Sequence, residues 1–279
     1  MLESTELMQA IDRIAAEAGQ EIMAVYRQSG DIEVVRKQDE SPLTEADTRA
    51  NAYICRALAA LTPEVPVVSE EAALPPYSQR RHWQQYWLVD PLDGTREFVS
   101  RNGEFTVNIA LVRDAVPVLG VIHAPVTETT WAGVLGLGAW KREGEGVFQP
   151  IRTRALAEDI CQQELVVMAS RRHGAGPLRG VLEGLAPRFA SMTLMNLGSS
   201  LKFCAIAEGK ADLYVRLGPT CEWDTAAAQV ILEAAGGQVM NAQFSVLAYN
   251  GKESILNPSF VAVGDTRQDW AQLLGRIDP

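Results

Sequence analysis

A short run of acidic and turn residues is the part of this chain best suited to chemistry. Asp90 ends an apolar stretch, Asp93 follows in the turn after Pro91-Leu92, and Gly94-Thr95 then open a predicted helix. Carboxylate oxygens are the ligands that Mg²⁺ prefers, and backbone N–H groups at a helix start can hold phosphate. The sequence therefore predicts adjoining metal and phosphate sites, the arrangement that metal-assisted hydrolysis of a phosphate ester requires.

Other acidic residues stand at the ends of predicted elements. Glu70 and Glu71 follow a predicted strand, Asp47 lies in the first turn of a predicted helix, and Asp224 directly precedes another. Each has an ordinary structural interpretation, as a solvated turn, a helix cap or a partner of the helix dipole. Asp90 is the acid that these interpretations leave unexplained.

Composition sets the class of protein. The chain has 279 residues, 47% apolar and 22% charged, which is ordinary for a globular protein. Its net charge of −10 argues against a partner that is a nucleic acid polymer. A small anionic substrate is compatible with this charge, because bound cations can invert the local field.

Cysteine usage and hydropathy bear on the compartment. Cys55, Cys161, Cys204 and Cys221 form no C-x-x-C pair, so we expect buried, reduced thiols and no structural zinc. The sequence shows neither a signal peptide nor an integral membrane segment. We therefore expect a cytoplasmic protein, and peripheral contact with the cytoplasmic face of the inner membrane stays open.

The elements that must position the acids follow from periodicity. The segment from Leu7 to Val25 and the segment from Thr44 to Leu61 are predicted helices, the second with a capping box between Thr44 and Asp47. The predicted strands of the first half cover residues 32–35, 65–69, 86–90, 105–112, 116–123 and 129–134. We expect loops over residues 37–42 and 141–146.

Strands and helices alternate after about residue 153, which predicts an α/β second half. The predicted strands cover residues 165–169, 189–195, 213–215 and 260–263, and the predicted helices cover residues 177–185, 199–208, 225–235 and 268–277. We place a domain boundary near residue 150, which gives lobes 1–150 and 151–279.

Four motifs together resemble the lithium-sensitive, Mg²⁺-dependent inositol monophosphatase superfamily. They are the T-x-A-D element at Thr44–Asp47, the [GS]-E-E element at Ser69–Glu71, the D-P-[IL]-D-G-T signature at Asp90–Thr95 and the W-D-x-A-[AG] element at Trp223–Ala227. They occur in the family's order. The resemblance implies the sugar phosphatase fold, a layered α/β sandwich in which helices lie between mixed sheets, and a site between the two lobes.

The resemblance also implies roles for individual residues. Glu70, Asp90, the Leu92 carbonyl, Asp93 and Asp224 are similar to the family's ligands for two or more Mg²⁺ ions. Leu92, Asp93, Gly94 and Thr95 are similar to the residues that line the phosphate, and Glu70 and Asp224 also approach the substrate. Asp47 and Thr95, with Glu70, are similar to the catalytic residues, of which Asp47 and Thr95 orient the attacking water.

Within the superfamily, the chain most resembles the bisphosphate nucleotidases, because Gly198-Ser199-Ser200-Leu201-Lys202 carries a lysine that simple inositol monophosphatases usually lack. This resemblance implies that Ser199, Ser200, Lys202 and His173 contact the nucleotide. Lys202 suits a remote 5′-phosphate as a point charge, although a solvated lysine is its common structural fate.

We therefore predict a phosphatase that hydrolyses adenosine 3′,5′-bisphosphate to AMP and phosphate, with the 3′-phosphoadenosine 5′-phosphosulfate of sulfur assimilation as a second substrate. An inositol monophosphatase or fructose-1,6-bisphosphatase of the same superfamily is the alternative enzyme. A non-catalytic nucleotide or metal sensor is the alternative from another class, since fold alone does not choose among them.

Overall fold

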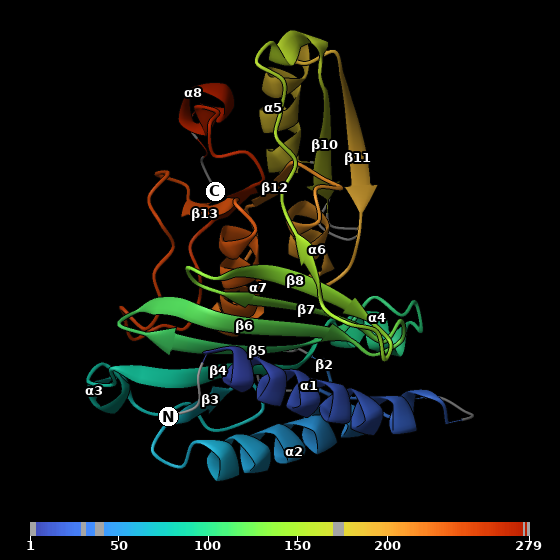
Figure 1. The fold of residues 1–279 in the computed structure, drawn as a ribbon, viewed down its shortest axis with the longest axis vertical. Helices are drawn as coiled ribbons and strands as arrows, with labels where there is room; N and C mark the ends of the chain where they lie inside the picture. The colour runs from blue at the N-terminus through green and yellow to red at the C-terminus, as the bar shows by residue number, and fades with distance from the viewer. Residues whose placement is uncertain (1–3, 29–31, 37–41, 170–175, 276, 278–279) are drawn as a thin grey trace.

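Helices and sheets alternate in layers in the computed structural model, which describes residues 4–28, 32–36, 42–169, 176–275 and 277 (Figure 1). One helix pair covers the outer face of the first sheet, a second pair lies between the sheets, and a third covers the outer face of the second sheet. In this order, the pairs are α1 (Ser4–Tyr26) with α2 (Glu45–Leu61), α6 (Leu201–Ala207) with α7 (Glu222–Ala234), and α5 (Gly176–Leu185) with α8 (Trp270–Leu274). The prediction of a layered α/β fold is confirmed.

The first sheet is built from strands that follow one another along the chain. Within the described residues, its neighbours run in the order β3 (Val67–Ser69), β4 (Gln85–Asp93), β5 (Thr106–Arg113), β6 (Val116–Ala124), β7 (Thr129–Val134), β8 (Gly138–Glu143) and β9 (Gln149–Ile151). β3 pairs with β4 in parallel, and every later pair is antiparallel. The predicted series of antiparallel strands is confirmed.

Alternation along β4 explains why both faces of this sheet are covered. Trp87 and Val89 pack with α1 and α2, whereas Tyr86 and Leu88 pack in the core that contains α6 and α7. Because side chains on a strand point alternately to opposite faces, an almost continuous apolar run serves two cores at once.

The second sheet has the mixed topology expected of an α/β half. Its strands lie in the order β11 (Ser191–Asn196), β10 (Glu164–Ala169), β12 (Leu213–Arg216), β14 (Phe260–Val263) and β13 (Gln238–Asn241). β10 is parallel to both of its neighbours, and β14 is antiparallel to both of its own. The remaining elements are short: the hairpin β1 (Val35–Arg36) and β2 (Pro42–Leu43), α3 (Tyr77–Arg80), α4 (Thr95–Val99), and the 3₁₀ turns Ile160–Gln162 and Ala186–Arg188.

Helix α7 approaches the first sheet very closely. A Cβ atom on Gly120 would lie 2.6 Å from the Ala227 carbonyl oxygen, and one on Gly133 would lie 2.6 Å from Ile231 Cα. Glycine at these strand positions lets the helix backbone rest on the sheet. This packing fixes the N-terminal end of α7, which carries Asp224.

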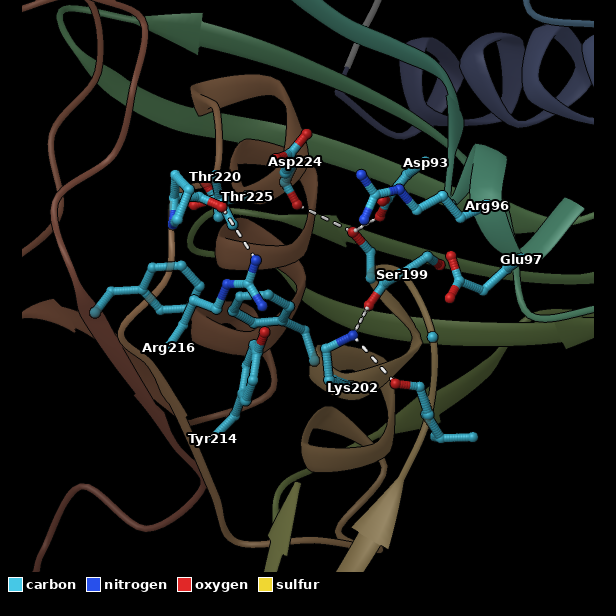
Figure 2. Close-up of a pocket in the computed structure, with 17 residues that line it drawn as sticks. Asp93, Arg96, Glu97, Ser199, Lys202, Tyr214, Arg216, Thr220, Asp224 and Thr225 are labelled. Atoms are coloured by element: carbon cyan, nitrogen blue, oxygen red, sulfur yellow. Dashed lines mark hydrogen bonds between the residues drawn. The ribbon is translucent and has the colours of Figure 1, made fainter. Parts of the chain in front are cut away.

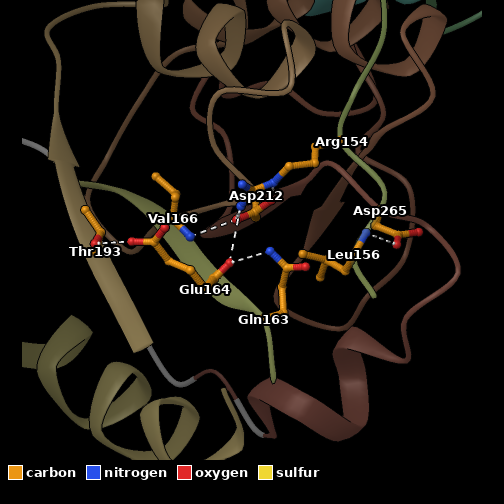
Figure 3. A network of polar contacts seen from close by, with 8 residues as sticks. All are labelled: Arg154, Leu156, Gln163, Glu164, Val166, Thr193, Asp212 and Asp265. Carbon is orange, nitrogen blue, oxygen red and sulfur yellow. Dashed lines mark hydrogen bonds and ion pairs between the residues drawn. The ribbon is translucent and has the colours of Figure 1, made fainter. Parts of the chain in front are cut away.

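The connector between the sheets is held by buried carboxylates (Figure 3). Asp212 accepts hydrogen bonds from Arg154 Nε at 3.0 Å and from the Val166 N–H at 2.7 Å. Asp265 accepts one from the Leu156 N–H at 2.8 Å. The segment between β9 and β10 is therefore held in place against the second sheet. The division into two lobes near residue 150 stays a prediction.

Several predicted boundaries were wrong. β8 continues to Glu143 through part of the predicted 141–146 loop, and β4 continues through the whole Asp90–Asp93 motif. The predicted strand 32–35 is a strand only at Val35–Arg36, Pro42 begins β2 where a loop was predicted, and residues 37–41 lie outside the described residues.

Other segments depart from the sequence expectations as well. The last helix covers only Trp270–Leu274, and α3, β8, β9 and β13 were not predicted. The expected burial of all four cysteines holds at Cys204 alone, since Cys55 and Cys221 are partly exposed and Cys161 is exposed.

Candidate active site

A bulge in β4 brings the two aspartates of the motif to one face of the sheet. Asp90 pairs with Asn108 and Asp93 pairs with Thr106, so two residues of β4 lie opposite the single residue Val107 of β5. In a regular strand, side chains three residues apart would point to opposite faces. The extra residue of a bulge corrects this, and it also accommodates a proline that cannot donate to the ladder.

Three carboxylates from distant parts of the chain meet on that face. Oxygens of Glu70, Asp90 and Asp224 all lie within 4.8 Å of one another. Glu70 follows β3, where its N–H donates to the Val89 carbonyl at 3.1 Å. Asp224 lies in the first turn of α7, where the Cys221 N–H donates to Asp224 Oδ2 at 2.8 Å. Four of the predicted metal ligands thus lie in one region, since Asp93 adjoins this cluster through Ser200.

The electrostatics of the cluster fit a divalent cation. Burial, followed by the neighbouring charge of Glu70, raises the pKa of Asp90 well above its usual range. Burial, followed by the charge of Asp93, raises the pKa of Asp224 in the same way. Buried like charges are costly unless an opposite charge compensates them. An oxygen-rich, hard donor set of this kind suits Mg²⁺ or a similar ion.

Asp47 and Thr95 form the predicted pair. Thr95 Oγ1 lies 3.2 Å from Asp47 Oδ1, and Asp47 Oδ2 accepts hydrogen bonds from the Thr44 N–H at 2.7 Å and the Thr44 hydroxyl at 2.6 Å. The predicted capping box of α2 is therefore present, and it fixes the orientation of the Asp47 carboxylate. The preceding Gly94 has φ +94°, a conformation that favours glycine and that sets the start of α4.

A pocket lined by residues of both predicted lobes adjoins the acidic residues (Figure 2). Asp93 and Gly94 line it from the first lobe, and Ser199, Ser200 and Lys202 line it from the second. His173, which we expected on the nucleotide side, lies outside the described residues.

Lys202 is buried, so its interpretation as a solvated lysine was wrong. Its ammonium donates to the Ser199 carbonyl at 2.6 Å and the Leu197 carbonyl at 3.2 Å, and it lies 5.5 Å from the centre of the Tyr214 ring. Burial lowers its pKa to about 8, although the charge of Asp93 opposes that shift. A buried cation that lines a pocket is a suitable anion contact.

Ser200 lines the pocket but is buried, and its hydroxyl contacts the acidic residues. The residue is 1% exposed, and its hydroxyl lies 2.8 Å from Asp93 Oδ2 and 3.0 Å from the Asp224 carbonyl. Its hydroxyl is thus engaged by the residues of the acidic region, whereas the sequence resemblance implied a contact with the nucleotide.

Sequence reasoning missed Arg96, Tyr214 and Arg216, which also line the pocket. Arg216 ends β12 and donates to the Pro219 carbonyl at 3.0 Å. A cation at the carboxyl end of a strand, directly before the turn of Gly218 and Pro219, was the signal that could have identified it. The pocket therefore has two cationic side chains, Arg96 and Arg216, that the motifs alone do not indicate, together with the acid Glu97.

The fold and the site define a layered α/β protein with a carboxylate cluster next to a pocket that is lined by both acidic and basic side chains. A family model described as the inositol monophosphatase family matches residues 3–274. The chain belongs to the inositol monophosphatase family.

Curated relatives agree with this membership. The chain is 46% identical over 254 residues to the 3′(2′),5′-bisphosphate nucleotidase CysQ of Salmonella typhimurium, covering 91% of this chain and 98% of the relative. It is 45% identical to CysQ of Escherichia coli K12 over the same shares of the two chains. The predicted resemblance to the bisphosphate nucleotidases within the superfamily is confirmed.

Solved structures share the fold. CysQ from Bacteroides thetaiotaomicron superposes with a TM-score of 0.80 at 40% identity, over 93% of this chain and 97% of that one. Inositol monophosphatase from Anabaena superposes with a TM-score of 0.71 at 22% identity, which concerns the fold alone. Among the described residues, no helix has the length and apolarity needed to cross a membrane.

Proposed function

We propose that this protein is a Mg²⁺-dependent 3′(2′),5′-bisphosphate nucleotidase, which hydrolyses adenosine 3′,5′-bisphosphate to AMP and phosphate. The observation that carries the proposal is the cluster of Glu70, Asp90 and Asp224 beside a pocket lined by Lys202 and Arg216. A bisphosphate substrate needs both features, one for the reacting phosphate and one for the second. The names of the relatives at 36–46% identity support this substrate class.

The metal ligands that we propose are Glu70, Asp90, Asp93, Asp224 and the Leu92 carbonyl. Two or more Mg²⁺ ions held there would polarise the phosphate ester and acidify the attacking water. The chain contributes the fixed geometry of this site. The bulge aims Asp90 and Asp93 the same way, and the Leu92 N–H holds Asp90 Oδ1 at 3.0 Å.

The remaining roles belong to groups on this chain. Asp47, held by Thr44, accepts a proton from the water or fixes its direction through the Thr95 hydroxyl. The N–H groups of Gly94 and Thr95 stabilise negative charge that grows on the phosphoryl oxygens. Lys202 and Arg216 hold the 5′-phosphate, with Ser199 and His173 as further nucleotide contacts. A 5′-phosphosulfate would occupy the same anion subsite and gives the second substrate.

A substrate panel tests the proposal. Phosphate release from adenosine 3′,5′-bisphosphate, inositol 1-phosphate and fructose 1,6-bisphosphate is measured with the purified full chain at several Mg²⁺ concentrations. We expect the nucleotide to have the highest kcat/KM and the activity to vanish without Mg²⁺. A preference for inositol 1-phosphate would favour the alternative enzyme, and nucleotide binding without turnover would favour a sensor.

Cytoplasmic location and peripheral membrane contact stay predictions.

A further inference from the structure

A line of buried polar side chains runs from β5 to the turn before α6 and contacts the acidic residue Asp93. Thr106 and Asn108 on β5 are 0% and 1% exposed, and neither belongs to the motifs of the family resemblance. Thr106 Oγ1 lies 3.1 Å from Ser199 Oγ, and Asn108 Nδ2 lies 2.9 Å from Ser200 Oγ. These contacts tie the turn that lines the pocket to the strand opposite Asp90 and Asp93.

The hydrogen bonds in this line have a defined direction. The Thr106 hydroxyl donates to Asn108 Oδ1 at 2.9 Å, so the amide group of Asn108 turns its N–H donors toward the second lobe. One of those donors reaches Ser200 Oγ, and Asn108 Nδ2 also lies 3.3 Å from Asp93 Oδ2. Ser200 thus accepts from Asn108, and its single hydrogen is left to donate.

That hydrogen points into the acidic region. Ser200 Oγ lies 2.8 Å from Asp93 Oδ2 and 3.0 Å from the Asp224 carbonyl oxygen. Asp93 Oδ2 therefore receives donors from both lobes, one from Asn108 and one from Ser200. With Oδ2 fixed in this way, the orientation of the whole Asp93 carboxylate is set before any ligand binds.

The register of the sheet gives Asn108 and Thr106 their position. Asn108 lies directly opposite Asp90 and Thr106 lies directly opposite Asp93, across the bulge in β4. Their side chains share the face of the sheet that carries the cluster, since they are two residues apart on one strand. Removing a hydrogen-bond partner of this buried amide would destabilise the protein, because a buried polar group would be left without a hydrogen bond.

We infer that Asn108 is a positioning residue for the metal cluster, which acts through Ser200 and Asp93 and fixes the two lobes relative to each other. The inference deepens the proposed function and rests on it, because it assigns Asn108 to the support of the proposed Mg²⁺ ligands. Groups that orient metal ligands in this way typically change metal affinity or activity by about 10- to 100-fold when they are removed.

The first test compares Mg²⁺ binding of the wild-type chain and Asn108→Leu by isothermal titration calorimetry, without substrate. Leucine has a similar size and removes both polar functions of the amide. We expect the Mg²⁺ dissociation constant to rise by about tenfold or more. In steady-state assays, the Mg²⁺ concentration for half-maximal activity should rise in parallel, while KM for the nucleotide at saturating Mg²⁺ changes little.

A matched pair of variants separates positioning from general stability. Thr106→Val and Thr130→Val each remove one hydroxyl from a 0%-exposed threonine of the same sheet, but Thr130 Oγ1 contacts His123 Nδ1, away from the cluster. We expect Thr106→Val to weaken Mg²⁺ binding by about threefold or more and Thr130→Val to leave it unchanged. If Asn108→Leu does not fold, this pair and Ser200→Ala carry the test.

The outcomes distinguish the inference from the proposed function. Wild-type Mg²⁺ affinity in folded Asn108→Leu, or equal effects of Thr106→Val and Thr130→Val, would overturn the inference alone. Weakened Mg²⁺ binding in Asn108→Leu, together with no hydrolysis of the nucleotide by the wild type, would support the inference and reject the proposed function. A wild-type chain that binds no Mg²⁺ would overturn both.

Discussion

Thr95 Oγ1 lies 3.2 Å from Asp47 Oδ1, although the two residues are on different helices. Thr95 is the last residue of the Asp90–Thr95 motif and the first of α4, and Asp47 lies in the first turn of α2. The other oxygen of Asp47 accepts hydrogen bonds from two groups of Thr44. These bonds fix the orientation of the carboxylate that contacts Thr95. Because the Thr95 hydroxyl donates to the Asp47 carboxylate, its oxygen can accept a hydrogen bond from a water molecule and direct it.

We predict that Asp47→Asn lowers kcat by about 100-fold or more, the size of effect expected when a general base is lost. Asparagine keeps an acceptor for the Thr44 N–H, so the helix cap should survive. KM for the nucleotide and the Mg²⁺ dissociation constant should change far less than kcat. Steady-state kinetics and calorimetry on the same preparation measure all three quantities.

Thr95 provides the control for that assignment. Thr95→Ser keeps the hydroxyl and should keep most of the activity, whereas Thr95→Val removes it and should behave like Asp47→Asn. Equal activity of the serine and valine variants would contradict the role of the hydroxyl.

Removal of the divalent cation should destabilise the protein. Glu70, Asp90 and Asp224 repel one another when no cation lies between them. A ligand at about 100 times its dissociation constant stabilises the folded state by about 2.7 kcal/mol. We expect EDTA to lower Tm and added Mg²⁺ to restore it, as measured by differential scanning fluorimetry.

Asp90→Asn identifies the cluster as the source of that effect. The variant should lose at least about 100-fold in rate, the usual cost of one strong electrostatic contributor. Its Tm should no longer respond to Mg²⁺, and without metal it should be at least as stable as the wild type, since one buried charge is gone. If Asp90→Asn turns over substrate with Mg²⁺ as fast as the wild type, the assignment of Asp90 as a metal ligand is wrong. Asp93→Asn should lose activity to a similar extent.

Lys202→Met tests the anion subsite, because methionine removes the positive charge and keeps a side chain of similar size. We expect KM for adenosine 3′,5′-bisphosphate to rise by about tenfold, which corresponds to about 1.4 kcal/mol. KM for adenosine 3′-monophosphate, which lacks the 5′-phosphate, should change much less. The matched control is Lys210→Met, because the Lys210 side chain is 58% exposed and pairs with Glu208. Equal effects of Lys202→Met on both substrates would remove this role.

Because of His123, the folded protein should lose stability as the pH falls. Burial lowers its pKa to about 4, against 6.5 for an ordinary histidine. The imidazole is therefore neutral in the folded protein, and the unfolded chain takes up a proton first as the pH falls from 6.5 toward 4. This linkage removes about 2 kcal/mol of stability between pH 7 and pH 4.5.

The measurement compares wild type with His123→Gln by urea unfolding at several pH values. The comparison is needed because burial raises the pKa of Glu222 and Glu233 to about 7, which makes acid stabilising at those two sites. The free energy of unfolding of the wild type should exceed that of His123→Gln by the largest amount at pH 7. This difference between the two proteins should be smaller by about 2 kcal/mol at pH 4.5. A gap that is constant with pH would reject the neutral buried imidazole.

The close approach of α7 to the first sheet gives a stability prediction. Gly120→Ala places a methyl group 2.5 Å from Val230 Cγ1, so either the helix or the strand must move. Overpacking of this kind costs about 1–3 kcal/mol. Gly180→Ala on α5 meets nothing within 4 Å and should be neutral or stabilising by up to about 1 kcal/mol. Urea unfolding of both variants measures the contrast.

The acidic residues of the site could be predicted from the sequence, but the buried residues that hydrogen-bond to them could not. Thr44, Asp47 and the motif from Asp90 to Thr95 carry local signals, because a cap and a turn are made by residues close in sequence. Asn108 carries none. Its position depends on the register between β4 and β5 and on the bulge opposite it, and a strand residue in an apolar run does not reveal its partners.

Charges misled the prediction at β8 for a related reason. Lys141, Arg142 and Glu143 have the composition of a loop, yet they end a strand. Lys141 pairs with Glu208 at 3.2 Å and Arg142 pairs with Asp12 at 2.7 Å, so distant segments supply the opposite charges. Long-range ion pairs of this kind cannot be read from neighbouring residues.

The dependence of the first sheet on α7 also bears on how the chain is made. Strands β6 and β7 emerge from the ribosome well before the helix whose backbone rests on Gly120 and Gly133. Until translation reaches α7, one apolar face of a completed sheet has no native cover, so the nascent chain must be shielded or wait unfolded. A premature stop codon before α7 would therefore yield an aggregating fragment and not an independent N-terminal domain.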